Sequence, residues 1–286
     1  MNFLTPTINQ LIRQALREDK TNEDWTTKLL VSSQAKSRAK IICQEQAVLC
    51  GLTLAQKVFK QLDPQLKFHT KFKDGSTVKK NTVIVTLHGK TRAILTGERP
   101  ALNFIGYLSG IATITRQYVQ QTANTRAQIY DTRKTTPTLR SLEKYAVHCG
   151  GGQNHRLNLE EMILFKDNHR AVLKGKLDLK AAVQRYRRFS KRKIIIEVDN
   201  LIQFQKALEV NPDIILLDNM TVTQIKGAVR VRNRIKQSSR RPLLEISGGV
   251  TLNTIHRLAI TGVERISVGA LTHTHKAIPV SLEILP

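Results

Sequence analysis

Six short apolar runs recur after Thr113, and they constrain the fold more than any other feature of the sequence. Their central residues lie 20 to 35 positions apart, and most of the intervening segments have the apolar spacing of helices. Strands that alternate with helices at such intervals indicate right-handed βαβ units with parallel strands. The pattern fits both an open doubly wound sheet and a barrel. The runs are Ala127–Tyr130, Met162–Phe165, Lys193–Val198, Asp213–Leu217, Leu243–Ile246 and Arg265–Val268.

The part of the chain before Thr113 mixes strands and helices in a different style. Two segments have helical spacing, Thr7–Arg17 and Leu52–Leu62, and an apolar stretch at Thr91–Gly110 is mostly helical. Between them, strands are expected within Lys40–Leu49, Phe68–Phe72 and Val83–Leu87. This mixture predicts an α+β layer, with the lone Trp25 in its core.

Polar or glycine residues follow each of the six runs. Because ligands bind at the carboxyl ends of parallel strands, these residues are candidates for one site. In chain order they are Asp131–Lys134, Lys166–His169, Glu197 with Asp199, Asp218–Asn219, Ser247–Gly249, and Gly269–Ala270 with Thr272 and His273.

The candidates sort by chemistry. Arg133, Lys134, Arg156 and Lys166 are receptors for anions, since Arg can grip a carboxylate with two parallel hydrogen bonds and Lys acts as a compact charge. His155 adds a donor that can be charged near neutral pH.

The glycine pairs and the acidic residues suggest a nucleotide-like ligand. Ser247–Gly249 and Gly269–Ala270 have the composition of backbone cradles for phosphate. Glu197 and Asp218 could hold ribose hydroxyls or a Mg²⁺ carried by a pyrophosphate, or they could form structural ion pairs.

The net charge of +24 points to anionic partners without choosing among them. A nucleic-acid-binding protein is one alternative, but the cations cluster with glycines at strand ends and aromatic residues make up only 5% of the chain.

The chain has no GxGxxG, no Walker A pattern and no stretch of 18 apolar residues. Three scattered cysteines, with no long apolar leader, favour a cytoplasmic protein that does not engage membranes.

A series of motifs resembles the nicotinate-nucleotide pyrophosphorylase (carboxylating) family, also called quinolinate phosphoribosyltransferases. The resemblance runs through nearly the whole chain. The motifs are Glu98–Phe104, Leu108–Thr113, Asp131–Pro137, Glu143–Val147, Gly150–Gly152, Asn154–Arg156, Lys166–His169, Leu217–Met220, Ser247–Gly249 and Val268–His273.

The resemblance implies an N-terminal α/β sandwich, residues 1–112 plus 274–286, and an incomplete α/β barrel with parallel strands, residues 113–273. It implies transfer of phosphoribose from phosphoribosyl pyrophosphate to quinolinate with Mg²⁺, giving nicotinate mononucleotide, pyrophosphate and CO₂. It also implies a homodimer with shared sites, or a higher oligomer, without nucleic acid or membrane.

By position, the resemblance assigns roles to individual residues. Arg133, Lys134, His155 and Arg156 should hold the two carboxylates of quinolinate, and Arg99 should reach the site of the partner subunit. The catalytic residues should be Lys166, Glu197 and Asp218, with the two carboxylates near ribose or metal. The remaining substrate contacts should come from Thr132, Ser247, Gly248, Gly249, Val268, Gly269, Ala270 and His273.

The chain departs from the family pattern at Thr138 and Asn158, where glycine is usual, at His148, where arginine is usual, and at Pro279, where aspartate is common. Two alternatives stay open: a related transferase that acts on nicotinate or another pyridine without decarboxylation, and a catalytically silent relative that only binds anions.

Overall fold

The computed structural model describes residues 6–172, 178–235 and 241–286. Its contacts divide the chain into two compact units. The first comprises 1–116, 141–151 and 274–286, and the second comprises 117–140 and 152–273. The expected division fell at 112/113. In the structure the first unit extends to residue 116 and also includes the segment 141–151.

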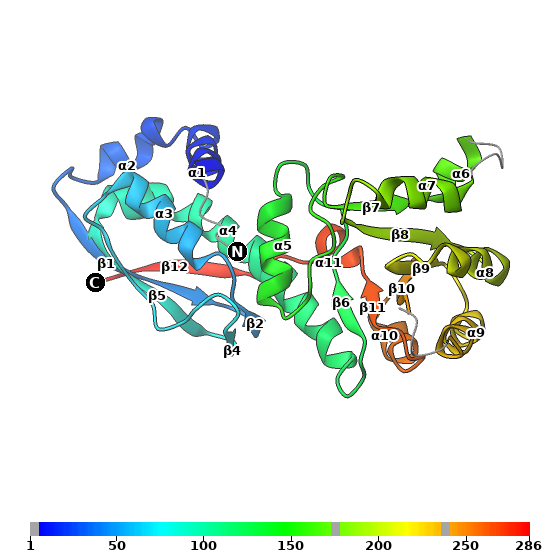
Figure 1. Cartoon of the computed structure of the whole chain (residues 1–286). Helices are drawn as coiled ribbons and strands as arrows, with labels where there is room; N and C mark the ends of the chain where they lie inside the picture. Colours follow the sequence, from blue (N-terminus) through cyan, green and yellow to red (C-terminus); the bar gives the residue numbers. More distant parts are fainter. Residues whose placement is uncertain (1–5, 173–177, 236–240) are drawn as a thin grey trace. The chain divides into compact units, whose positions relative to one another are not determined.

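The first unit is built on a four-stranded antiparallel sheet in the order β12-β1-β5-β3 (Figure 1). The strands are β1 (Lys36–Cys43), β3 (Lys67–His69), β5 (Thr82–Lys90) and β12 (Val280–Leu285), and a separate pair joins β2 (Ala47–Val48) to β4 (Thr77–Val78). Buried and exposed residues largely alternate along β1, as in a sheet with one covered face. The C-terminal strand β12 returns to pair with β1, from Arg38–Leu285 to Cys43–Val280.

The helices of this unit are α1 (Pro6–Glu18), α2 (Trp25–Leu30), α3 (Leu52–Leu62), most of α4 (Thr91–Gln121) and most of α5 (Arg140–Cys149), with a 3₁₀ turn at Thr21–Glu23. Helix α4 extends well beyond the expected Gly110 and contains Pro100. The prediction that Trp25 lies in the core is wrong. Trp25 opens the short helix α2 and is 64% exposed, with the ammonium group of Lys28 4.9 Å from its ring.

The second unit contains six parallel strands in the order β6-β11-β10-β9-β8-β7. They fall on the six apolar runs: β6 (Gln128–Tyr130), β7 (Met162–Phe165), β8 (Lys193–Val198), β9 (Ile214–Asp218), β10 (Leu243–Ser247) and β11 (Arg265–Ser267). Closing the sheet between β6 and β7 would give the sequential order of an α/β barrel. This strand order favours an incomplete barrel over an open doubly wound sheet.

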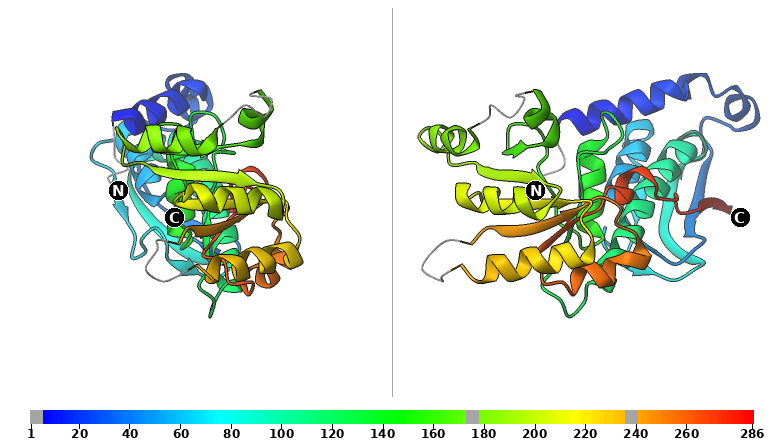
Figure 2. Two further views of the ribbon diagram at one scale, coloured as in Figure 1. Left: turned by 45° about the vertical axis from the view of Figure 1, so that its right-hand side comes forward. Right: turned by 90° about the vertical axis from the view of Figure 1, so that its right-hand side faces the viewer.

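Helices connect the strands and lie around the outside of the sheet, as Figures 1 and 2 show for α8, α9 and α10. The helices are α6 (Asp167–Val172), α7 (Leu179–Arg187), α8 (Leu201–Val210), α9 (Val222–Asn233), α10 (Leu252–Ala259) and α11 (Ala270–His273). Ile194, Ile196 and Val198 of β8 are buried, and β-strand alternation places them on the face opposite Ile195 and Glu197.

The interior of the barrel is apolar on one side and polar on the other. Ile195, Ile214 and Leu216 form a buried cluster with Met162 and Leu164 packed against it. Across the sheet, β10 and β11 contribute Glu245, Arg265 and Ser267, all buried. Layers of inward-facing apolar side chains normally fill the interior of small barrels, so the unusual feature here is the pair of buried charged residues on β10 and β11.

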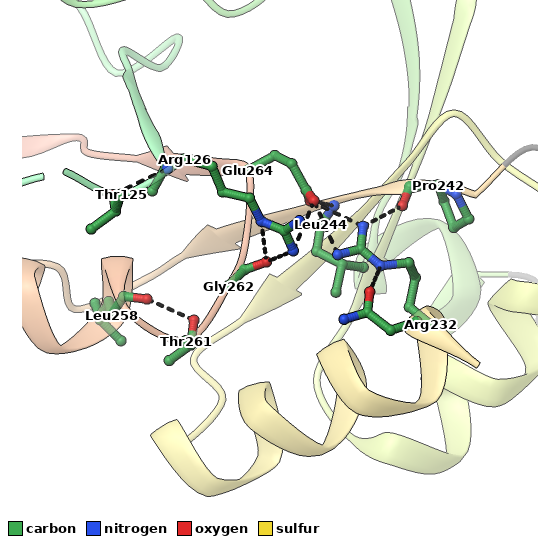
Figure 3. Close-up of polar contacts among 11 residues, drawn as sticks. Thr125, Arg126, Arg232, Pro242, Leu244, Leu258, Thr261, Gly262 and Glu264 are labelled. Atoms are coloured by element: carbon green, nitrogen blue, oxygen red, sulfur yellow. Dashed lines mark hydrogen bonds and ion pairs between the residues drawn. The ribbon is translucent and has the colours of Figure 1, made fainter. Parts of the chain in front are cut away.

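At the amino ends of β10 and β11, Glu264 binds two arginines (Figure 3). Its carboxylate accepts hydrogen bonds from Nη1 of Arg232 at 3.2 Å and from the backbone N–H of Leu244 at 2.9 Å. It also forms ion pairs with Nη2 of Arg232 at 3.0 Å and Nη2 of Arg126 at 3.3 Å. Arg232 is buried and also donates to the carbonyl of Pro242. In a barrel this end carries structural contacts, so we interpret the network as stabilising.

Candidate active site

A cavity of about 500 Å³ opens at the carboxyl ends of the six strands, within the second unit. It is lined by Thr132, Arg133, Lys134, His155, Arg156, Leu164, Lys166, Glu197, Leu216, Glu245, Ser247, Gly248, Gly249, Val250, Thr251, Ser267, Gly269, Ala270 and His273. Residues at or just after the ends of five strands, together with Leu216 inside β9, therefore meet in one basin, as the sequence predicted for those five strands.

Strand register explains why these residues meet. Glu197 pairs with Leu216, and Leu216 pairs with Glu245, so these residues at the same level of neighbouring strands point to the same side. Leu164, Leu216, Glu245 and Ser267 belong to the strands themselves and form the floor of the cavity. The cations and glycines that follow the strands form its rim, whereas the floor combines apolar and charged side chains.

Three expected contact residues do not line this cavity. Asp218 lies at the end of β9, where its carboxylate accepts from Asn219 and its charge acts on Glu197. Val268 is buried, and its backbone N–H donates to the carbonyl of Tyr130. Arg99 belongs to the first unit, where it lines a separate cavity of about 440 Å³ with Tyr107 and Ile278.

A larger cavity, about 860 Å³, lies in the first unit beside β3, β5 and α3. Its charged lining residues are Lys71 and Lys73, which are exposed or half-exposed, and Asp74, which accepts from the hydroxyl of Tyr145. It lacks the convergence of cations, carboxylates and glycines found in the second unit. We therefore assign the candidate active site to the smaller cavity.

The cationic side chains that line the basin are Arg133, Lys134, Arg156 and Lys166. Arg133 and Lys134 are exposed beyond the end of β6, in a turn closed by the bond from the Lys134 N–H to the hydroxyl of Thr132. Arg156 is buried, and one of its N–H groups donates to the carbonyl of Met162 at 2.9 Å. Burial and the nearby charge of Arg133 lower the pKa of Arg156. Such mutual repulsion is relieved by a bound anion.

The carboxylate of Glu197 lies beside Lys166 and Asp218. Burial, the largest influence, raises its pKa above 4.5, and the charges of Asp218 and Asp167 add to the increase. The charge of Lys166 and a hydrogen bond from the Asp167 N–H act in the opposite direction. Two carboxylates that repel each other beside a basic pocket are a natural place for a cation or a positively charged reaction centre.

The glycines after β10 form a concave backbone segment. Gly248 and Gly249 both have positive φ, +87° and +60°, and α10 follows with Thr251 as its N-cap. Glycine lets the backbone N–H groups of such a turn approach a ligand closely, and the helix N-terminus adds its dipole. The arrangement can bind a phosphate group.

Sequence reasoning missed one charged residue of the basin. Glu245 was counted as part of an apolar strand, but its side chain is fully buried and lines the cavity. Burial alone would raise its pKa, but hydrogen bonds from His155 and Ser267 and the charge of Arg265 outweigh this effect and lower it to about 2. A carboxylate interrupting an apolar run at an inward position was the signal that could have identified it.

Within the described ranges, no group of three or more His, Cys, Asp or Glu residues could hold a metal ion by itself. In the same ranges, no helix is both long and apolar enough to cross a membrane.

The fold and the basin define the class of protein: an enzyme with an incomplete α/β barrel that binds small, multiply charged anions at the carboxyl ends of its strands. Two family models match the chain, the N-terminal domain of quinolinate phosphoribosyl transferase over residues 24–109 and the C-terminal domain over residues 111–283. The chain belongs to the quinolinate phosphoribosyltransferase family.

Relatives in three organisms support this assignment along the whole length. A probable nicotinate-nucleotide pyrophosphorylase (carboxylating) of Synechocystis sp. is 39% identical, covering 97% of this chain and 92% of the relative. A second, from Methanocaldococcus jannaschii, is 35% identical and covers 96% of both. The solved structure of the nicotinate-nucleotide pyrophosphorylase from Francisella tularensis is 36% identical, with a TM-score of 0.89 over 98% of this chain and 96% of that one.

Proposed function

We propose that the chain joins quinolinate to phosphoribosyl pyrophosphate and releases CO₂, giving nicotinate mononucleotide and pyrophosphate for NAD synthesis. The observation that carries the proposal is the convergence of Arg133, Arg156 and Lys166 with two glycine cradles in one basin. Both substrates carry several negative charges, and the basin offers receptors for each kind of anionic group. Family membership independently supports the same reaction.

In this proposal the cations divide between the two substrates. Arg133, Lys134 and Arg156 hold the two carboxylates of quinolinate, since they are close enough for Arg133 to influence Arg156. Ser247–Gly249, Gly269 and Ala270 bind phosphate through backbone N–H groups, with His273 and Thr132 beside them. Lys166 lies next to Glu197 and would stand between the two substrates.

The carboxylates of Glu197 and Asp218 fit a role near ribose. As the pyridine nitrogen attacks the anomeric carbon and pyrophosphate leaves, positive charge develops on the sugar, and a nearby carboxylate stabilises it. The ribosylated ring is then electron-poor, so its C2 carboxylate can leave as CO₂. The cations must orient that carboxylate without holding it too strongly, so positioning supplies much of the rate.

The residues also fit Mg²⁺ bound together with phosphoribosyl pyrophosphate. Hard oxygen ligands suit Mg²⁺, and the pKa of Glu197 is raised by burial and, to a smaller extent, by the charge of Asp218. These two carboxylates would hold the ion, which when bound offsets the charge of the leaving pyrophosphate. Because no cluster of three or more His, Cys, Asp or Glu residues in the described ranges could hold a metal ion, the substrate would have to supply ligands of its own.

The assay that tests the function uses quinolinate labelled with ¹⁴C at the C2 carboxylate, phosphoribosyl pyrophosphate and Mg²⁺. We expect ¹⁴CO₂ and nicotinate mononucleotide in equal amounts. Formation of the mononucleotide from nicotinate, with no CO₂ from quinolinate, would identify instead a transferase that does not decarboxylate. Absence of any mononucleotide from a folded, substrate-binding protein would identify a silent relative.

Replacing Glu197 with glutamine is expected to abolish most activity and yet stabilise the protein at neutral pH. Because the folded-state pKa is raised, the folded protein holds the proton more tightly than the unfolded chain, and stability decreases as pH rises through that window. Glutamine is neutral and avoids this loss. Thermal unfolding at pH 7 and at pH 4.5 measures the difference, which should shrink at the lower pH. An unchanged or lower melting temperature at pH 7 would contradict the argument.

We propose a homodimer in which Arg99 serves the partner's active site. Support comes from its position in a cavity of the first unit, separate from the basin. If so, Arg99→Ala and Arg133→Ala proteins will each lose most of their activity, and reassociated mixtures will recover up to about one quarter of wild-type activity, because half the dimers then hold one intact site. A mixture that stays inactive while dimers exchange would exclude shared sites.

The cytoplasm is the proposed location, supported by the three cysteines, Cys43, Cys50 and Cys149, which are all free thiols.

A further inference from the structure

We propose that Glu245 is a positioning residue that fixes the quinolinate-binding side of the basin through His155. The inference rests on the proposed function, since it concerns how that substrate is held. It also gives His155 a different task from the direct carboxylate contact expected from the sequence.

Glu245 accepts hydrogen bonds from three side chains. Its Oε2 accepts from Nε of Arg265 at 2.6 Å, and its Oε1 accepts from the hydroxyl of Ser267 and lies 3.2 Å from Nε2 of His155. Arg265 is stacked on the ring of Tyr130, with its guanidinium carbon 3.6 Å from the centroid. The carboxylate is therefore anchored on both oxygens.

The imidazole of His155 is engaged at both ring nitrogens. Its Nδ1 accepts the backbone N–H of Arg156 at 2.8 Å, so this nitrogen carries no hydrogen. The hydrogen is then on Nε2, which donates to Glu245. With both nitrogens bound inside the protein, the ring acts as a bridge from Glu245 to the backbone of Arg156.

The backbone on the other side of His155 is also fixed. Asp131, at the end of β6, accepts the His155 N–H at 2.8 Å through one oxygen and the side-chain amide of Asn154 at 2.7 Å through the other. Arg156 starts from this anchored segment, and one of its guanidinium N–H groups is bound to Met162. The hydrogen bonds that link Glu245 through His155 to the backbone of Arg156 therefore help to fix the direction of the other N–H groups of the Arg156 guanidinium.

Charge explains why the bridge needs Arg265. A bare carboxylate in the floor of the basin would repel a dicarboxylate substrate. Arg265, itself buried, neutralises Glu245 from behind, so the floor positions the cations above it without opposing the substrate. Glu245 should therefore affect quinolinate binding far more than phosphoribosyl pyrophosphate binding.

The test compares Glu245→Gln with Glu264→Gln. Both variants remove an arginine-paired carboxylate from the same unit, but Glu264 lies at the opposite end of the barrel. For Glu245→Gln we expect the KM for quinolinate to rise about tenfold or more, with the KM for phosphoribosyl pyrophosphate changed less than about threefold. Glu264→Gln should lower the melting temperature while leaving both KM values near wild type. Adding His155→Gln to Glu245→Gln should change the quinolinate KM by less than about twofold further.

An independent measurement is the ¹⁵N NMR spectrum of the His155 imidazole in the wild-type protein at pH 7.5. We expect the neutral tautomer with its hydrogen on Nε2. A hydrogen on Nδ1, or a quinolinate KM in folded Glu245→Gln within about threefold of wild type, would overturn the proposal. Equal increases in both KM values would do the same. A wild-type protein that makes no nicotinate mononucleotide would refute the proposed function instead, while the tautomer would still be measurable.

Discussion

Replacing Arg133 with alanine will lower kcat/KM for quinolinate by a factor of about 30 to several thousand. The estimate is about 2–5 kcal/mol, the scale for removing one partner of a desolvated, hydrogen-bonded charge pair. Arg133 is exposed in the free protein, but it lines the basin and lies close enough to Arg156 to lower the pKa of that residue. Two such neighbouring guanidinium groups match a dianion, and removing one leaves a carboxylate unpaired.

Steady-state kinetics with both substrates measures this effect, and two variants serve as controls. Arg133→Lys keeps the charge but loses the planar pair of donors, so it should recover only part of the activity. Arg257→Ala removes the same charge from the exposed face of α10 and should change kcat/KM by less than about twofold. A loss below about tenfold in Arg133→Ala would argue against two-pronged recognition of a carboxylate.

Replacing Glu264 with alanine will lower the free energy of unfolding by about 3 kcal/mol, in the range for breaking a buried ion pair. The carboxylate is 20% exposed, but Arg232, its partner at 3.0 Å, is only 4% exposed (Figure 3). Without Glu264 the Arg232 guanidinium is left buried without that counter-charge, and the N–H of Leu244 loses its acceptor. The first loss falls on helix α9 and the second on strand β10, which carries part of the basin.

Urea unfolding followed by circular dichroism will show the change as a lower midpoint. The double variant Arg232→Met with Glu264→Leu is the control, because removing both charges avoids an unpaired one and should be less damaging than Glu264→Ala alone. A loss below about 1 kcal/mol in Glu264→Ala would mean that water replaces the carboxylate. A double variant as unstable as the single one would assign the effect to packing.

The strands of the second unit could be predicted because each is a short apolar run in a polar context. All six runs became strands, and their ends delivered the expected cations and glycines to one cavity. The choice between barrel and open sheet could not be made in advance, since it depends on which strands become edges. Only the pairing of β6 with β11, far along the chain, settled it.

The errors have physical causes. Trp25 was assigned to the core on hydrophobicity alone, but a short helix can leave its first residue in solvent. Glu245 was overlooked because burial of a carboxylate depends on partners from other strands, namely His155, Arg265 and Ser267. The sequence shows locally only that a carboxylate interrupts an apolar run, and it does not show which residues pair with that carboxylate.

The structure explains why the family usually has glycine at position 138. Thr138 stands where the family usually has glycine, and its φ is +68°, a left-handed conformation that is unfavourable for a β-branched residue. Holding it there costs on the order of 1–2 kcal/mol, which the surrounding loop must offset. The loop begins at Arg133 and Lys134, so the strain lies beside the basin.

The return of β12 to the sheet of the first unit sets an order of events during synthesis. This strand pairs with β1, yet it follows the whole second unit along the chain. The segment before it runs against α4 at Gly106 and Gly110, where a methyl group would overlap the carbonyl oxygens of Ile278 and Lys276. On a ribosome, the second unit can therefore fold while β1 still has an unpaired edge, and a nascent chain would expose that edge to other chains until its last strand emerges.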